Sequence, residues 1–387
     1  MNSLIGIHTT GGVPIEWLEQ TVRDGKPLAV VKSVDNPGVC IDVKRVSPST
    51  ITIARFTPEI NLQEISDNPD VNIIPIASQI IDQILNRTNA VERQSIDYYE
   101  VCNEPDPPEV WGYVNLARLM QECMHQANFY GFKLALFAFN LGSPDWDEMV
   151  AIRDTGVFED AYNGGHVITF HEGDRYGPMV SFGSIPDAPF VEGAGPNSFR
   201  HRYLYSLIPV GQRPGCVISE FYGGYSDTFD AQIIANRWAD YDREFAKRSY
   251  SKGFGAFTVR PTAEWVNQNY DSIFPMMLGY LADVDYPDPI DEEIEMAYSV
   301  LTSPRPAKNV YTYNSVPSAL NVRDLNNDVV GSIAYGETVN VWETNLTVIG
   351  GGKSYSDRAY IQPVGSTRNH IWDAAPPDSQ TKTLEYL

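Results

Sequence analysis

Eight short apolar runs recur along the first three hundred residues of the chain, and each has the length of a β-strand. Within them apolar residues follow one another rather than alternating with polar ones, which is typical of strands buried on both faces of a parallel sheet. The runs cover Leu4–His8, Leu28–Val34, Thr50–Phe56, Ile96–Cys102, Lys133–Phe139, His166–Phe170, Gly215–Glu220 and Gly253–Val259.

Helical patterns separate these runs. They cover Pro14–Arg23, Val71–Asn86, Val110–Tyr130, Phe229–Arg248 and Ile273–Leu281, and Asp230 is placed to cap the fourth. Eight strand–helix alternations in about 285 residues match the size and rhythm of a (β/α)8 TIM barrel. A doubly wound open sheet is the main alternative, but its glycine-rich first turn is not matched by Thr9-Thr10-Gly11-Gly12.

The composition changes between Pro287 and Pro306, where acidic residues and prolines interrupt the strand–helix rhythm. Short strand patterns joined by turns follow, at Ala319–Asp324, Val329–Ile333, Glu337–Trp342 and Arg358–Ile361. We interpret the chain as a barrel over residues 1–300, a small all-β unit over 301–368 and a polar, extended tail over 369–387.

The charge of the chain restricts its partners. It carries 50 acidic and 28 basic residues, a formal net charge of −22, and binding to phosphate groups requires clustered Lys and Arg. We therefore expect no nucleic acid and no membrane partner, and no apolar run approaches the roughly 18 residues of a spanning helix. No basic segment precedes the first strand, so no signal peptide is expected. The compartment stays open, with a secreted or cell-wall location favoured over the cytoplasm.

The four cysteines and six histidines show none of the spacings typical of metal sites. There is no CxxC, HxH or HExxH pattern, and the GxSxG elbow of serine hydrolases is absent too. We therefore expect no metal and no cofactor.

Two glutamates stand where a TIM barrel places its catalytic groups, at the carboxyl ends of strands. Glu104 follows the fourth run in Asn103-Glu104-Pro105, and Glu220 ends the seventh. Facing one another at about 5–5.5 Å, two such carboxyl groups suit a retaining glycosidase. Burial and mutual repulsion would keep one of them protonated near neutral pH. Glu100 shares the parity of Glu104 and is expected to line the barrel interior lower down.

This pattern resembles the superfamily of retaining glycosidases with catalytic glutamates on strands four and seven (clan A). The resemblance covers roughly residues 3–285 and rests on Asn103-Glu104-Pro105 and on Glu220. It implies a carbohydrate substrate whose O-glycosidic bonds are cleaved by double displacement. It also implies that Glu104 is the acid/base, that Glu220 is the nucleophile, and that Asn103 binds the sugar 2-hydroxyl. The Trp that often ends strand eight in that superfamily is absent, and Trp265 is the nearest one.

Further polar and aromatic residues stand at or just beyond predicted strand ends, and we predict that they bind substrate or orient Glu220. An Arg would hold the nucleophile ionised, a Trp would stack on a sugar ring, and the Arg after strand eight would contact an anionic substrate. Each residue has an ordinary alternative as a rim salt bridge or as packing. They are His8, Lys32, Arg55, Trp111, Trp146, His171, Glu172, Tyr222 and Arg260.

The second unit resembles the bacterial SH3-like domain. The resemblance rests on Leu320-Asn321-Val322-Arg323, on Val330-Gly331-Ser332-Ile333 and on Gly336-Glu337. It implies a cell-wall ligand for this unit, and a stabilising appendage without a ligand is the alternative. Two other functions therefore stay open for the whole chain: a peptidoglycan-directed wall lysin, and an inactive protein that binds carbohydrate or cell wall.

Overall fold

The computed structural model describes residues 1–57, 60–174, 182–224 and 230–289, together with nine strands between residues 305 and 386. Contacts divide the chain into two units, Met1–Asp291 and Glu292–Leu387. The boundary predicted at residue 300 lies outside the described residues and stays a prediction.

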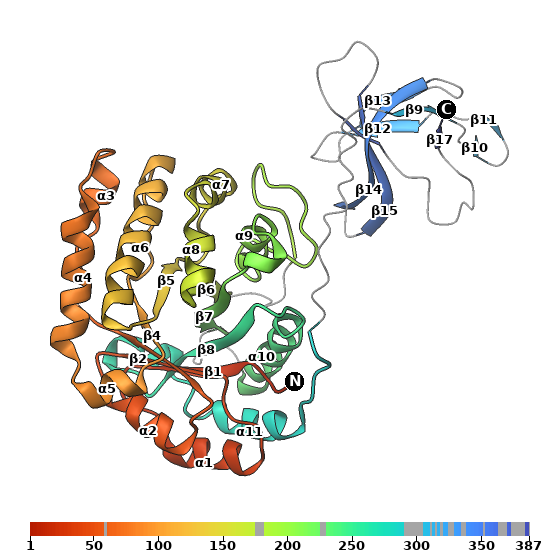
Figure 1. The fold of residues 1–387 in the computed structure, drawn as a ribbon. Helices are drawn as coiled ribbons and strands as arrows, with labels where there is room; N and C mark the ends of the chain where they lie inside the picture. The colour runs from red at the N-terminus through yellow and green to blue at the C-terminus, as the bar shows by residue number, and fades with distance from the viewer. Residues whose placement is uncertain are drawn as a thin grey trace. The chain divides into compact units, whose positions relative to one another are not determined.

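The first unit is a closed barrel of eight parallel strands hydrogen-bonded in chain order, which confirms the predicted (β/α)8 barrel (Figure 1). Almost every strand residue is buried, as the continuous apolar runs indicate. The strands are β1 (Ile5–Thr9), β2 (Val30–Val34), β3 (Ile51–Arg55), β4 (Tyr98–Glu100), β5 (Leu134–Phe139), β6 (Val167–Gly173), β7 (Gly215–Tyr222) and β8 (Ser251–Val259).

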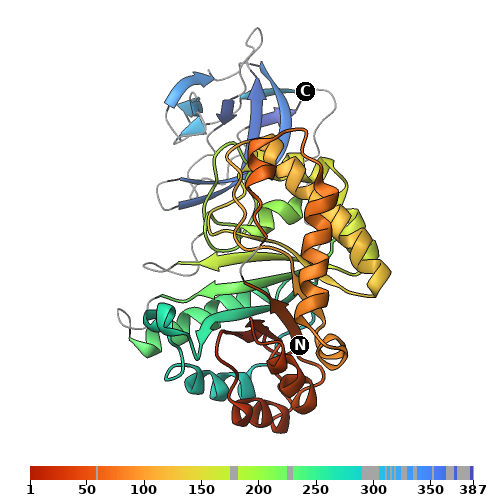
Figure 2. The same cartoon turned by 90° about the vertical axis from the view of Figure 1, so that its left-hand side faces the viewer.

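Helices surround the barrel, and Figure 2 shows them from a second direction. Asp230 accepts a hydrogen bond from the backbone N–H of Gln232 at 2.8 Å, which confirms its predicted place as a helix cap. The helices are α1 (Ile15–Arg23), α2 (Gly38–Val46), α3 (Gln63–Asp67), α4 (Ile73–Arg87), α5 (Ala90–Ser95), α6 (Val110–Tyr130), α7 (Trp146–Asp154), α8 (Val157–Gly164), α9 (His201–Ser206), α10 (Ala231–Phe245) and α11 (Phe274–Asp283), with 3-10 turns at Val210–Gln212 and Ala263–Gln268. Among the described residues, no helix is long and apolar enough to cross a membrane.

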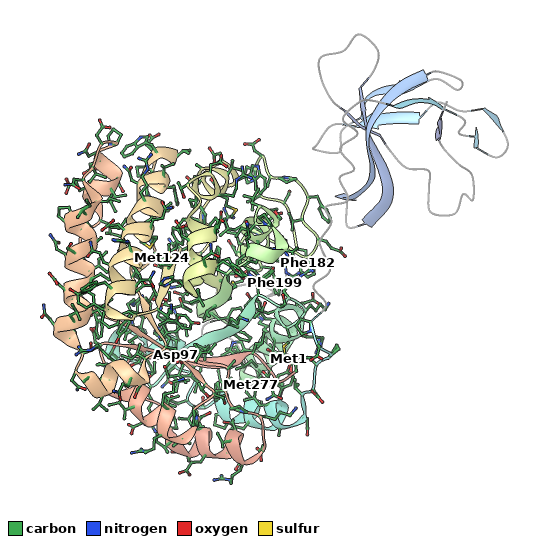
Figure 3. The ribbon with its side chains drawn as sticks, viewed as in Figure 1. Met1, Asp97, Met124, Phe182, Phe199 and Met277 are labelled. Carbon is green, nitrogen blue, oxygen red and sulfur yellow. The ribbon has the colours of Figure 1, made fainter. Side chains whose placement is uncertain are left out.

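Two apolar layers stabilise the barrel. The larger layer lies between strands and helices, where Met124 on α6 and Met277 on α11 are buried (Figure 3). The smaller layer fills the barrel interior with side chains from five strands: Val30, Ile53, Ala135, Val167 and Val217. Residues two positions further along β2 and β3 point the same way, because side chains alternate along a strand. The interior therefore changes from an apolar layer to charged residues toward the carboxyl ends.

The second unit holds a seven-stranded sheet in the order β13-β12-β16-β15-β14-β9-β17 and a two-stranded sheet of β10 and β11. The pairings described between its strands are all antiparallel. The SH3-like domain stays a prediction. The strands are β9 (Arg305–Asn309), β10 (Thr312–Tyr313), β11 (Val316–Pro317), β12 (Leu320–Arg323), β13 (Val329–Ile333), β14 (Thr338–Gly350), β15 (Lys353–Gln362), β16 (His370–Trp372) and β17 (Leu384–Tyr386).

Candidate active site

A local irregularity in β7 points Glu220 into the barrel. Val217 belongs to the interior layer, and Ser219 lies within 3.5 Å of the Lys32 ammonium. Strict alternation would then direct Glu220 outward. The pairing of β7 with both neighbours shifts register around this position, so one extra residue is accommodated and Glu220 also faces inward.

The Glu220 carboxylate lies among positively charged and hydrogen-bonding side chains from several strands. Its Oε1 is 2.9 Å from Lys32 Nζ on β2 and 3.1 Å from Arg55 Nη1 on β3. The Nε2 atoms of His8 and His171 lie 3.5 and 3.6 Å from the same oxygen. The Tyr222 hydroxyl donates to Oε2 at 3.2 Å. Five of the predicted residues thus meet Glu220.

These neighbours hold Glu220 ionised. Burial raises the pKa of its carboxyl group, because the charged form loses hydration. The surrounding side chains outweigh burial and hold that pKa well below its ordinary value; in decreasing order they are His171, Lys32, His8 and Arg55. A buried carboxylate that stays charged at neutral pH has the ionisation state of a nucleophile.

The side chains that surround Glu220 are called the cluster below, and Glu104 reaches it from the loop after β4. The cluster consists of Glu220, Lys32, Arg55, His8, His171 and Tyr222. The backbone of Glu104 is in the left-handed region, with φ of 48°, and its N–H donates to the carbonyl of Ala138 on β5 at 3.0 Å. Its Oε1 is 2.9 Å from Nδ1 of His171, whose other ring nitrogen faces Glu220. One imidazole ring therefore separates the two glutamates. The Glu104 side chain is 31% exposed and that of Glu220 is 5% exposed, so Glu104 is the one accessible to solvent.

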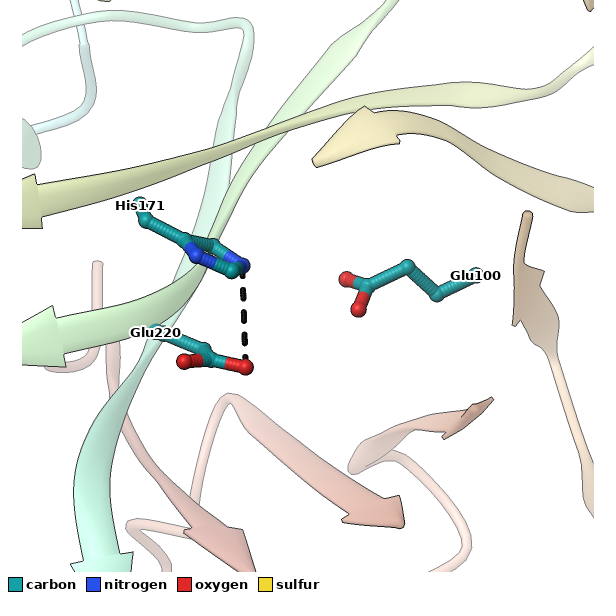
Figure 4. Close-up of side chains that lie close together, drawn as sticks. All are labelled: Glu100, His171 and Glu220. Carbon is teal, nitrogen blue, oxygen red and sulfur yellow. Dashed lines mark ion pairs between the residues drawn. The ribbon is translucent and has the colours of Figure 1, made fainter. Parts of the chain in front are cut away.

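Glu100 lies deeper and faces Glu220 from the other side of the barrel (Figure 4). Its carboxylate is fully buried, 2.5 Å from Lys32 Nζ and 3.7 Å from Arg55 Nη1. Burial raises its pKa, but Lys32, Arg55 and His171 outweigh this effect, so the pKa is lowered. Glu100 is therefore ionised and is not a proton donor, and its predicted position low in the interior is confirmed.

Glu100, His171 and Glu220 are the one group with metal-ligand spacing among the described residues, with donor atoms within 4.8 Å of one another. Lys32 makes close ion pairs with both carboxylates. Its ammonium supplies the positive charge that a metal ion would bring, so this donor set does not fit a divalent cation.

Phe257 on β8 lies beside the cluster, in the strand where the sequence lacks the Trp of the resembled superfamily. Its ring centroid is 4.5 Å from that of His8, 5.1 Å from Tyr222 and 5.0 Å from Trp265. The next residue, Thr258, is 3.1 Å from His8 Nδ1 through its hydroxyl. We did not predict either residue, because an apolar residue and a threonine inside a buried strand carry no chemical signal.

Asn103 is held at the edge of the cluster, where its side-chain oxygen accepts a hydrogen bond from Arg55. It also lines a hollow of about 380 Å³ between the loops after β3 and β4, with Leu62, Pro105 and Asp106 among the other lining residues. The neighbours of Glu104 on both sides, Asn103 and Pro105, line this hollow, but Glu104 itself is not among the lining residues.

The structure does not bring four predicted residues to the cluster. Glu172 is fully buried and faces away from the barrel interior, because it neighbours the inward-facing His171. Trp146 begins α7 and packs against the outer apolar layer, and Trp111 lies in the first turn of α6. Arg260 is exposed beyond β8, where it lines a separate hollow of about 330 Å³ with Gly11, Asp42 and other residues.

Comparison with known proteins adds distant structural similarities. No protein-family model matches the chain, and no curated protein matches it in sequence. A family 39 glycoside hydrolase from Bacteroides cellulosilyticus is 9% identical, with a TM-score of 0.46 over 93% of this chain and 71% of its own.

Two further structures are a trimodular family 5 endoglucanase and an endo-β-1,6-glucanase. The endoglucanase is 11% identical with a TM-score of 0.42 over 95% of this chain and 77% of its own. The glucanase is 10% identical with a TM-score of 0.38 over 96% of this chain and 91% of its own. Proteins that share the barrel fold carry out many different reactions, so the function of this chain depends on the residues of its site.

Proposed function

We propose that the protein is a retaining glycoside hydrolase with Glu220 as nucleophile and Glu104 as acid/base. The observation that carries the proposal is that both carboxyl groups contact opposite nitrogens of the His171 ring. One carboxylate is buried and kept charged, and the other is partly exposed. Double displacement requires two carboxyl groups in these different environments, on one site.

In the first step, a Glu220 oxygen attacks the anomeric carbon while the bond from that carbon to the leaving oxygen breaks. Glu104 gives its proton to that oxygen, and a glycosyl ester on Glu220 is formed. In the second step, Glu104 takes a proton from water, the water oxygen attacks the anomeric carbon, and the ester bond breaks to regenerate the Glu220 carboxylate. Two inversions at one carbon give net retention.

The neighbouring residues have defined parts in this scheme. Arg55 contacts both Glu220 and Asn103, so it fixes the nucleophile relative to a side chain that can bind a sugar hydroxyl. Tyr222 donates to Glu220 Oε2, which leaves Oε1 for the cationic side chains.

A panel of aryl glycosides, followed by proton NMR of the first-formed anomer, tests the proposal. We expect hydrolysis with retention, and loss of turnover in both Glu104→Gln and Glu220→Gln. Clean inversion would contradict the assigned pair. Turbidity clearing of cell walls distinguishes a wall lysin, which uses the same chemistry on peptidoglycan, from an enzyme acting on other glycans.

Binding without turnover is the second candidate, and Lys32 favours it. A fully buried ammonium 2.9 Å from Glu220 lowers the nucleophilicity of the carboxylate that it stabilises. Under this reading wild type and Glu104→Gln bind a glycan equally well and neither releases an aglycone from any glycoside.

A further inference from the structure

Lys32 and Glu100 form an ion pair beneath Glu220 that the proposed reaction does not itself require. Lys32 is fully buried and lies closer to Glu100, at 2.5 Å, than to Glu220, at 2.9 Å. A buried lysine is costly unless its charge is compensated, so this pair needs an explanation in the chain.

Before reaction the charge of the Lys32 ammonium is balanced by neighbouring carboxylates. Lys32 and Arg55 each lie within ion-pair distance of both Glu100 and Glu220. His8 adds no charge near neutral pH, because burial lowers its pKa to about 4. The double displacement disturbs this balance, since a Glu220 that carries a glycosyl ester is neutral.

We infer that Glu100 is a positioning residue that compensates the Lys32 charge while Glu220 is esterified. This inference rests on the proposed function. Without Glu100, the intermediate would leave the buried Lys32 ammonium with no carboxylate within ion-pair distance among the described residues. With Glu100, that ammonium keeps a carboxylate partner, so esterification of Glu220 costs less free energy than it would without Glu100.

The contacts of the Glu100 carboxylate indicate an electrostatic role rather than a structural one. Neither of its buried oxygens accepts a hydrogen bond of good geometry from the described residues, so its partners are the ion pairs with Lys32 and Arg55. The charged and titratable groups around the pair are His8, Arg55, His171, Glu220 and the Tyr222 hydroxyl.

A double-mutant cycle of Lys32→Met and Glu100→Gln tests the inference. In Glu100→Gln, Lys32 has only Glu220 as an ion-pair partner, so Glu220 is a weaker nucleophile. Formation of the glycosyl-enzyme, measured as the burst of aglycone, should slow by at least about tenfold. Hydrolysis of the glycosyl-enzyme should not slow. Lys32→Met leaves excess negative charge and should move the acidic limb of the rate profile to higher pH. The double variant restores balance and should retain more activity than either single variant.

A conservative variant and melting temperatures serve as controls for the double-mutant cycle. Glu100→Asp preserves the charge and should recover part of the burst rate. Melting temperatures of the four proteins should show the same coupling, with the double variant more stable than either single one. Additive kinetic losses, or a Glu100→Gln variant with an unchanged burst, would overturn the inference. Wild type that hydrolyses no glycoside would overturn the proposed function instead, and the melting temperatures would still report whether the charges are coupled.

Discussion

Glu220 and Glu172 are both buried carboxylates with lowered pKa values, yet most of their partners differ in kind. Glu172 faces away from the barrel interior and accepts four hydrogen bonds. They come from the backbone N–H of Phe199 at 2.6 Å and of His201 at 2.9 Å, and from the Tyr241 hydroxyl at 2.6 Å and His201 Nδ1 at 2.8 Å. Glu220 faces inward and is held mainly by cationic side chains.

The comparison separates a carboxylate held by directional hydrogen bonds from the one that we propose to be reactive. Directional bonds from backbone groups and a tyrosine use the acceptor positions of Glu172 and tie β6 to α9 and α10. Lys and Arg stabilise the Glu220 charge through space, so the carboxylate can form a bond to another atom while they keep their places. Burial and a lowered pKa are shared, and only the kind of partner distinguishes the two sites.

The largest effect is expected at Glu220, the carboxylate that we propose to be the nucleophile. Glu220→Gln should lower kcat/KM for aryl glycosides by at least about 10⁴-fold, because the amide cannot act as the nucleophile. Circular dichroism should show a folded barrel. Activity within tenfold of wild type would end the assignment of Glu220.

Glu172→Gln is the matched change at the structural member. Each Glu172 oxygen accepts two bonds, so an amide nitrogen in place of either oxygen leaves two buried donors without an acceptor. The free energy of unfolding should fall by about 3 kcal/mol, measured by urea denaturation. The kcat of the folded fraction should stay near that of wild type, and a selective loss of kcat would place Glu172 in the reaction.

Two buried histidines, one inside the barrel and one outside the cluster, are expected to make the stability of the protein depend on pH. Burial lowers the pKa of His8, inside the barrel, and of His166, which accepts the Leu134 N–H at 2.9 Å, from 6.5 to about 4. Between these values the unfolded chain binds the protons and the native protein does not, so stability falls as pH drops from 6.5 to about 4. The loss should reach up to about 3 kcal/mol per histidine.

Thermal unfolding between pH 4 and 6.5 measures how steeply the stability of the protein depends on pH. His166→Gln should flatten this slope without changing the pH profile of kcat, whereas His8→Gln should alter both, because His8 faces Glu220. A slope unchanged in both variants would contradict the lowered pKa values.

The smallest effect is expected for the tryptophans predicted to stack on sugars. Trp111→Ala should raise KM by no more than about tenfold with kcat unchanged, which corresponds to one lost stacking contact. Trp146→Ala should instead lower stability, since Trp146 packs against the outer apolar layer. Isothermal titration with an oligosaccharide measures the loss of binding expected for Trp111→Ala, and urea denaturation measures the loss of stability expected for Trp146→Ala.

The eight-strand barrel and most of the cluster could be predicted because the carboxyl ends of parallel strands converge. His8, Lys32, Arg55, His171 and Tyr222 were found in this way, without knowledge of which side chains touch. The helices α2, α3, α5, α7, α8 and α9 were not predicted individually, since five to nine residues give few turns of a helical period; α1, with nine residues, was predicted as Pro14–Arg23.

Apart from Glu100, the face on which a strand residue lies was not predicted, because strands buried on both sides show no alternation of apolar and polar residues. His171 and Glu172 looked equivalent as strand-end residues, and their opposite orientations emerge only from the fold. The register shift that turns Glu220 inward leaves no mark in the sequence either. The fourth strand was predicted as Ile96–Cys102 but is only Tyr98–Glu100, because pairing ends before the loop that carries Glu104.

The irregularity of β7 makes the length of this strand as important as its composition. Removing one residue between Val217 and Glu220 would restore strict alternation and leave Glu220 facing inward, at the position that Ser219 now holds beside the Lys32 ammonium. A library that varies side chains here while preserving chain length would therefore keep the carboxylate at its present level in the barrel, whereas one that varies length would shift it along the strand relative to the cationic side chains.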